Sequence, residues 1–168
     1  MEGTVYVAVV GAGRATPLDT DAAEHVGRHL AEAGAVVVCG GLGGVMEAAC
    51  RGARGAGGPT VGILPGTDRA EANHHVGIAL ATGMGEARNA LVVGTADAVV
   101  AVGGEFGTLS EIALALQAGK AVVGLGTWEL ARAGAPVAGV VPAAGPAEAA
   151  RLALEGAARW RRSGRSRS

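Results

Sequence analysis

Two glycine-rich turns in this sequence have the composition of an anion site. "CGGLGG" (residues 39–44) and "GGEFGT" (residues 103–108) each follow an apolar run and each precede a helical pattern. Such turns present unpaired backbone N–H groups and the positive end of a helix dipole to a phosphate or a carboxylate. Glycines that only make tight turns are the alternative, but two such turns over one sheet favour the anion site.

Arg88 and Glu111 add a cation and an acid to these turns. Arg88 lies in "TGMGEARNALVV", and Glu111 follows Thr108 by three residues in the helical pattern after the second turn. A guanidinium binds phosphate through paired hydrogen bonds. The alternatives are that Arg88 is a solvated surface charge and that Glu111 is an acid favoured by the helix dipole.

Other chemistry-bearing residues indicate no further site. "GAGRAT" (residues 11–16) has threonine where a dinucleotide fingerprint has its third glycine, and Lys120, the only lysine, does not follow a phosphate loop. We expect Cys39 and Cys50 to be reduced thiols, with a redox pair as the less favoured alternative. We expect the histidines to be solvated or packed and predict no metal site. They are His25, His29, His74 and His75.

Apolar runs alternate with amphipathic segments along the chain. Helices are expected within residues 19–34, 44–55 and 107–119, and another around Arg88. The strands lack apolar–polar alternation, which is typical of a parallel sheet covered by helices on both faces. The sequence therefore predicts an α/β, Rossmann-like three-layer fold with a mostly parallel β-sheet and a ligand at the carboxyl ends of the strands. Strands are expected at Val5–Val10, Ala35–Cys39, Thr60–Leu64, Ala98–Val102, Ala121–Leu125 and, more weakly, Val137–Val141.

Composition limits the domain organisation and the partners. The 168 residues suffice for one core, and with 49% apolar but only 2% aromatic residues that core must consist of Val, Ala, Leu and Ile. We expect one nucleotide-binding domain over residues 1–158 and a basic, disordered tail over residues 159–168. A net charge of -1 and an amino terminus without signal-peptide features predict a cytoplasmic protein with neither membrane nor specific nucleic-acid partners.

Three segments carry a resemblance to a known family. "GGLGGVMEAA", "GMGEARN" and "GGEFGTLSE" resemble, in this order, the Lonely-Guy (LOG), lysine-decarboxylase-like family and its molybdenum-cofactor-carrier-like bacterial branch. The resemblance covers roughly residues 4–125. It implies a Rossmann-like fold, a nucleotide ligand and a homo-oligomer, either a dimer or a tetramer. Plant-type members hydrolyse the N-glycosidic bond of cytokinin riboside 5′-monophosphates to the free base and ribose 5-phosphate.

The resemblance assigns positions in this sequence. Arg88 matches the arginine of the family's arginine–lysine pair. The family's PGGxGTxxE loop is matched by Gly104, Gly107, Thr108 and Glu111, and its other glycine turn by Gly40, Gly41 and Gly44. Asn89 replaces the lysine, Gly103 the proline and Glu105 the second glycine of the loop. These departures favour the carrier-like branch.

By resemblance, Arg88 and Glu111 are the candidate catalytic residues of a phosphoribohydrolase. Glu111 would stabilise an oxocarbenium-like sugar or activate water, and Arg88 would hold the ribose or the phosphate. Glu47, Glu86 and Glu105 remain open as the acid that protonates the base. Glu105 either faces solvent or contacts the ligand. The residues expected to bind phosphate or nucleotide are Gly40, Gly41, Gly44, Gly104, Gly107 and Thr108, and further candidates are Gly11, Arg14, Met84, Asn89 and Glu105.

Two functions follow from these residues. The first is hydrolysis of nucleoside 5′-monophosphates, which needs no cofactor. The second is a non-catalytic carrier or sensor that binds an AMP-like nucleotide or a molybdopterin-type cofactor in the same cleft. Arg88 and Glu111 favour the first, whereas Asn89, Gly103 and Glu105 favour the second.

Overall fold

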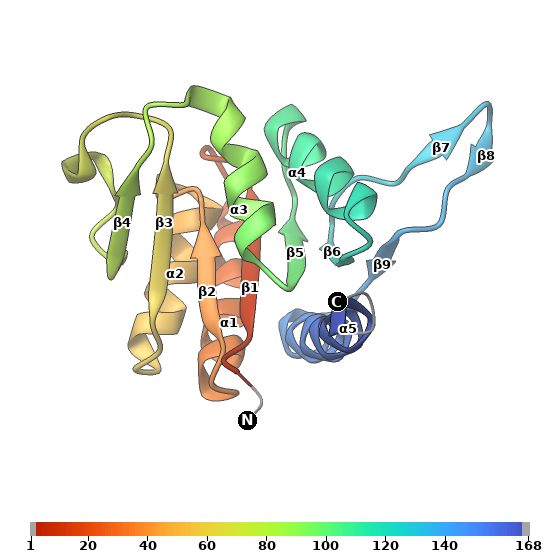
Figure 1. Cartoon of the computed structure of the whole chain (residues 1–168), viewed down its shortest axis with the longest axis horizontal. Helices are drawn as coiled ribbons and strands as arrows, with labels where there is room; N and C mark the ends of the chain where they lie inside the picture. Colours follow the sequence, from red (N-terminus) through yellow and green to blue (C-terminus); the bar gives the residue numbers. More distant parts are fainter. Residues whose placement is uncertain (1–2, 166–168) are drawn as a thin grey trace.

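Runs of valine and alanine form the centre of a seven-stranded parallel sheet (Figure 1). The computed structural model describes residues 3–165. The strand order is β4-β3-β2-β1-β5-β6-β9, so β1 lies between β2 and β5. The strands are β1 (Tyr6–Gly11), β2 (Val36–Cys39), β3 (Thr60–Leu64), β4 (Ile78–Ala81), β5 (Ala98–Val102), β6 (Ala121–Leu125) and β9 (Val140–Pro142).

Helices cover both faces of this sheet. Because successive side chains of a strand point to opposite faces, Val7 and Val9 pack with one set of helices and Ala8 and Val10 with the other. The first set is α1 (Pro17–Glu32), α2 (Val45–Gly55) and α5 (Pro146–Arg165). The second set is α3 (Asn89–Thr95) and α4 (Phe106–Gln117), on the opposite side of the sheet in Figure 1. The predicted Rossmann-like α/β fold is confirmed.

Two parts of the sheet region differ from expectation. The edge strand β4 was not predicted: Ile78 and Leu80 are exposed in it, and Ala79 and Ala81 are half-buried. Near the other edge, the predicted strand over residues 137–141 is observed only from Val140, as β9. A small antiparallel ribbon precedes it, formed by β7 (Ala131–Arg132) and β8 (Ala135–Pro136).

The carboxyl-terminal segment is helical for most of the predicted tail. Helix α5 runs to Arg165, so residues 159–165 of the expected tail are helical in this structure, and residues 166–168 lie outside the described residues. Hydrogen bonds tie this end to the rest of the fold: Trp160 Nε1 donates to the carbonyl of Ala118 at 3.4 Å, and Arg161 Nη1 donates to the carbonyl of Gly3 at 2.6 Å. Within residues 3–165, no helix combines the length and apolar content that crossing a membrane requires.

Lys120 secures the helix that begins beside the expected site. Its Nζ donates to the carbonyl oxygens of Val93, Gly94 and Ala96 at 2.7, 3.1 and 2.6 Å, at the carboxyl end of α3. The ring of Trp160 covers the ammonium at 4.7 Å. The single lysine of the chain is therefore a helix cap, and it fixes α3 against the sheet.

Candidate functional site

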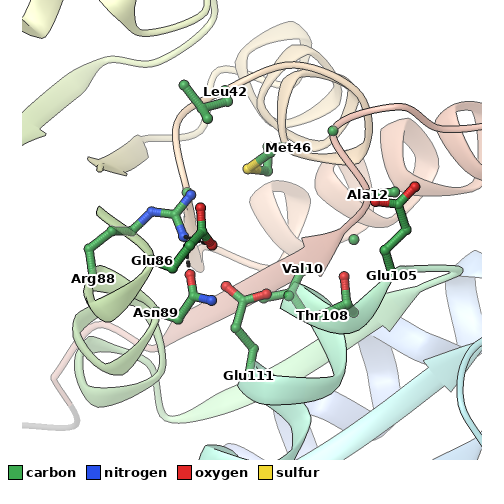
Figure 2. Close-up of a pocket in the computed structure, with 14 residues that line it drawn as sticks. Val10, Ala12, Leu42, Met46, Glu86, Arg88, Asn89, Glu105, Thr108 and Glu111 are labelled. Carbon is green, nitrogen blue, oxygen red and sulfur yellow. Dashed lines mark hydrogen bonds and ion pairs between the residues drawn. The ribbon is translucent and has the colours of Figure 1, made fainter. Parts of the chain in front are cut away.

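A cavity of about 270 Å³ lies at the carboxyl ends of β1, β2 and β5 (Figure 2). The chain leaves β1 toward β2 on one side, and β5 lies on the other, so this is the point of the sheet where the strand order reverses. Arg88 and Asn89 enter the cavity from one wall, and Thr108 and Glu111 from α4 on another. Its lining consists of Val10, Gly11, Ala12, Gly13, Gly40, Leu42, Met46, Glu86, Arg88, Asn89, Glu105, Gly107, Thr108 and Glu111.

The amino termini of two helices at this cavity lack side-chain caps. Helix α1, in contrast, is closed by its own residues: Thr16 Oγ1 accepts from the Asp19 amide at 3.1 Å, and Asp19 accepts from the Thr16 hydroxyl at 2.8 Å. Neither α2 nor α4 has a side-chain cap. Their first turns contribute Met46, Gly107 and Thr108 to the cavity wall. At α2 the Val45 N–H already donates to the carbonyl of Ala12 at 3.1 Å, so an anion meets the dipoles of both helices and the first-turn N–H groups of α4.

Arg88 is buried with part of its hydrogen-bonding capacity unused. It ends a short 3₁₀ helix, η2 (Gly85–Arg88), and only 5% of it is exposed. Nη1 donates to Asn89 Oδ1, and the exposed Glu86 carboxylate lies 3.9 Å from Nη1. Nε is buried and has no hydrogen-bond partner among the described residues. A buried donor without a partner costs about 1–3 kcal/mol, so the guanidinium would gain by turning toward an acceptor that enters the cavity.

Glu111 is the buried acid of the cavity. It is 7% exposed, and no hydrogen bond or ion pair joins its carboxylate to another residue in the described part of the chain. Burial raises the pKa of Glu111 to about 7, although the positive charge of Arg88 opposes that rise. The side chain extends toward Asn89 and Arg88 in Figure 2. At neutral pH this carboxyl therefore exchanges a proton readily.

Asn89 joins the two walls of the cavity. Its Oδ1 accepts from Arg88, and its Nδ2 donates to Ser110 Oγ at 3.1 Å. Ser110 Oγ in turn donates to the carbonyl of Gly107 at 2.6 Å. The residue that replaces the family's lysine thus links the guanidinium to the first turn of α4.

Glu105 lies at the rim of the cavity. It is exposed, it lines the cavity, and its side chain extends toward Ala12 in Figure 2. Within residues 3–165 it forms no ion pair with Arg14 or Arg88. Its carbonyl accepts a hydrogen bond from Trp128 Nε1 at 3.3 Å, and Trp128 contacts the Phe106 ring at a centroid distance of 5.6 Å. Its carboxylate is thus free to meet a ligand at the mouth of the cavity.

Some expected site residues support the cavity without lining it. Gly104 has φ +112° and lies so close to Thr108 that an added Cβ would be 2.5 Å from its Cγ2. Gly44 has φ +66°, and an added Cβ would be 2.3 Å from the Ala12 carbonyl oxygen. The remaining predicted residues outside the lining are Gly41, Arg14 and Met84, the latter two being exposed.

The wall also contains residues that were not predicted as site residues. Ala12 and Gly13 come from the loop after β1, Leu42 from the turn before α2, and Met46 from the first turn of α2. Ala12 and Gly13 both belong to the glycine turn "GAGRAT", and the position of β1 between β2 and β5 brings this turn to the cavity. Glu86 was considered only as an acid, and it lies at the cavity mouth with its side chain 79% exposed.

Comparisons with known proteins agree with this architecture. The SLOG cluster4 family matches residues 4–150. An uncharacterized protein of Archaeoglobus fulgidus is 46% identical over 121 residues, which are 72% of this chain and 80% of that protein.

Two solved structures are similar over nearly the whole chain. The molybdenum cofactor binding protein from Rippkaea orientalis has a TM-score of 0.84 and 36% identity, and the match covers 92% of this chain and 98% of that one. The molybdenum cofactor carrier protein of Chlamydomonas reinhardtii has a TM-score of 0.79 and 33% identity, with coverages of 93% and 99%. The resemblance found in the sequence motifs is confirmed, and this chain belongs to the SLOG cluster4 family.

Proposed function

We propose that this chain binds a phosphate-bearing small molecule of the molybdopterin or nucleotide type in the cavity and carries it without turnover. The observation that carries this proposal is Nε of Arg88, a buried donor without a partner in the wall of a cavity that two uncapped helices also border. Burying such a donor is unfavourable unless an acceptor arrives. A phosphate oxygen is an acceptor that a guanidinium and a helix amino terminus both favour.

The residues present fit such a ligand. The N–H groups of Gly107 and Thr108, the Thr108 hydroxyl and the Arg88 guanidinium would hold the phosphate. Glu105 and Glu86, both at the cavity mouth, would accept hydrogen bonds from the amino and imino groups at the edge of a pterin or purine ring. These two acids repel a second phosphate, which favours a ligand with one phosphate and a polar ring.

Relatives favour a carrier over an enzyme. The similar proteins from Rippkaea orientalis and Chlamydomonas reinhardtii are described as a molybdenum cofactor binding protein and a molybdenum cofactor carrier. In this proposal the cofactor is cargo, and Arg88, which Asn89 orients, holds it by hydrogen bonds that break on release.

Hydrolysis of nucleoside 5′-monophosphates is the second candidate. It is supported by one observation, the presence of Arg88 and Glu111 in a single cavity with the pKa of Glu111 near 7. Glu111 would stabilise the sugar cation or take a proton from water. Asn89, where plant-type enzymes have lysine, is the main difference from that activity.

A paired binding and turnover assay tests both candidates. Purified protein is titrated with AMP and with molybdopterin-type cofactor by calorimetry, and free base is measured by chromatography after incubation with a panel of nucleoside monophosphates. The carrier proposal expects stoichiometric binding, recovery of the ligand intact, no free base, and a loss of about tenfold or more in affinity in Arg88→Met. Arg51→Met is the control, because Arg51 pairs with Glu24 away from the cavity.

The two candidates fail in different ways. Release of base by the wild type that disappears in Glu111→Gln would replace the carrier with the hydrolase. Failure of both ligands to bind would reject both. The predicted homo-oligomer, a dimer or a tetramer, is tested on the same samples by light scattering.

A further inference from the structure

Two buried thiols lie against each other beneath the cavity. Sγ of Cys39, at the end of β2, is 3.4 Å from Sγ of Cys50, in α2, and both residues are fully buried and free. They cluster with Met46, and Leu42 and Val76 pack around them. Carrying a phosphate-bearing ligand uses neither thiol, so their contact calls for a separate explanation.

Hydrogen bonding gives the two thiols different roles. Cys39 Sγ accepts from the backbone N–H of Gly41 at 3.3 Å, and it also contacts Cys50 Sγ in a hydrogen bond in which either thiol can be the donor. Donation from the Cys50 thiol and from the Gly41 N–H lowers the pKa of Cys39, whereas the hydrogen bond to Cys39 and burial raise the pKa of Cys50. Cys39 is therefore the sulfur that becomes the thiolate, which is the nucleophilic form.

We propose that Cys39 and Cys50 are a reversible disulfide site whose oxidant is hydrogen peroxide. Hydrogen peroxide is close to water in size, and the cavity lies next to Cys39. Gly40, which follows Cys39 in the sequence, lines the cavity, and so does Met46, which packs with Cys39 in the buried cluster. Local opening of this wall brings peroxide to the sulfur. The sulfurs then need to approach from 3.4 Å to about 2.05 Å.

The chemistry balances in two steps. The Cys39 thiolate attacks one oxygen of the peroxide, the O–O bond breaks, and hydroxide leaves and takes a proton to become water. The product is a sulfenic acid. The Cys50 sulfur then attacks the Cys39 sulfur, the S–O bond breaks, and the thiol proton leaves with the hydroxyl as a second water. Two electrons pass from the thiols to the peroxide, and a low-molecular-weight dithiol reverses the reaction.

The bond would constrain one wall of the cavity. It closes a ring that contains the glycine turn, residues 40–44, and the first turn of α2, and both supply lining residues. Asn73 already holds this turn from outside, donating from Nδ2 to the carbonyl oxygens of Gly41 and Leu42 at 3.3 and 2.8 Å. Oxidation would therefore change the affinity for the ligand. This step alone rests on the proposed function.

Thiol mapping tests the disulfide independently of any ligand. Folded wild type is treated with peroxide from equimolar upward, quenched with catalase, alkylated under denaturing conditions and analysed by peptide mass spectrometry. Two alkylatable thiols are expected to fall to none, with a Cys39–Cys50 cross-linked peptide and full recovery after dithiothreitol. The unfolding midpoint should rise by about 5 °C or more, since the cross-link restricts the unfolded chain.

Several results would overturn the disulfide. They are two thiols that stay alkylatable, oxidation of Cys39 to sulfinic acid without a cross-link, or a midpoint that falls on oxidation. Cys50→Ser should give no cross-link and a Cys39 sulfenic acid that dimedone traps. The mapping on wild type stands even if that variant folds poorly.

A binding measurement distinguishes a failure of the disulfide proposal from a failure of the proposed function. AMP affinity is measured on the oxidised and reduced wild type, and a difference of about threefold or more is expected. Equal AMP affinities of the two forms would reject an effect of oxidation on ligand binding, and they would not affect the conclusion that the disulfide forms. If AMP binds neither form, the proposed function fails and the mapping result is unaffected.

Discussion

Gly40 and Arg88 are in contact at the carboxyl end of β2, and the absence of a side chain at position 40 is what admits the guanidinium. A Cβ at Gly40 would lie 2.7 Å from Arg88 Nη2 and 3.0 Å from its Cζ. Met46 Sδ, at 2.8 Å from the same point, closes the space from the other side. Gly40 does not have a positive φ. Position 40 therefore requires glycine for space and not for backbone conformation.

We expect Gly40→Ala to displace Arg88 and to weaken ligand binding about tenfold or more, because the guanidinium loses its position in the cavity wall. The free energy of unfolding should fall by about 1–3 kcal/mol, as in other overpacked sites. Calorimetric titration with AMP and urea unfolding measure the two effects. Gly55→Ala is the matched control, because nothing lies within 4 Å of a Cβ there. Unchanged affinity in Gly40→Ala would mean that Arg88 does not hold the ligand.

Glu111 should make stability depend on pH in a defined window. Its folded-state pKa is about 7 and its ordinary value is 4.5. Between these values the folded chain keeps a proton that the unfolded chain releases, so stability falls as the pH rises from 4.5 to 7. The decline attributable to this group is about 3 kcal/mol at most.

Glu111→Gln cannot titrate, so we expect a smaller loss of stability between pH 5 and pH 8, roughly the window set by the two pKa values. Urea unfolding midpoints at both pH values, for wild type and variant, give the comparison. Glu129→Gln, at an exposed glutamate, is the control and should behave like the wild type. Equal pH dependence in wild type and Glu111→Gln would show that burial does not raise this pKa.

The sequence predicted the central strands but not the edges. β1, β2, β3, β5 and β6 are almost wholly apolar because helices cover the sheet, and this pattern is local. β4 is an edge strand of four residues with two exposed side chains, so it carries no such pattern. β7 and β8 have two residues each and form only by pairing with one another. Helix α5 was not predicted although its pattern is local: Pro146 opens it, and the buried Ala149, Ala153 and Ala157 recur every four residues on one face.

The sequence predicted the charged residues of the candidate site but not the hydrogen bonds and contacts between them. Motif spacing indicated Arg88 and Glu111, and the fold brings both to one cavity. The bridge from Arg88 through Asn89 to Ser110 depends on how α3 packs beside α4, which no local pattern gives. The contact of Cys39 with Cys50 likewise depends on the register of α2 over β2.

Lys120→Met should destabilise the fold. The methionine keeps the apolar stem but leaves three carbonyl oxygens at the end of α3 without their donor. We expect a loss of about 2–4 kcal/mol in the free energy of unfolding, measured with urea. Arg151→Met is the control, because Arg151 pairs on the exposed face of α5 and such pairs contribute about 0.5 kcal/mol. A loss as small as that of the control would mean that water replaces the ammonium at these carbonyls.

Asn89 should act on binding through Arg88. Asn89→Ala removes the acceptor for Nη1, so the guanidinium is left with a further unsatisfied donor and is free to turn. We expect a five- to tenfold loss of AMP affinity, roughly 1 kcal/mol, in calorimetric titration. Ser110→Ala is the matched control, because it removes the far end of the same bridge and leaves the contact between Asn89 and Arg88 intact. If both variants lose affinity equally, the hydrogen bond from Asn89 to Ser110 of α4, and not the one between Asn89 and Arg88, is what positions the ligand.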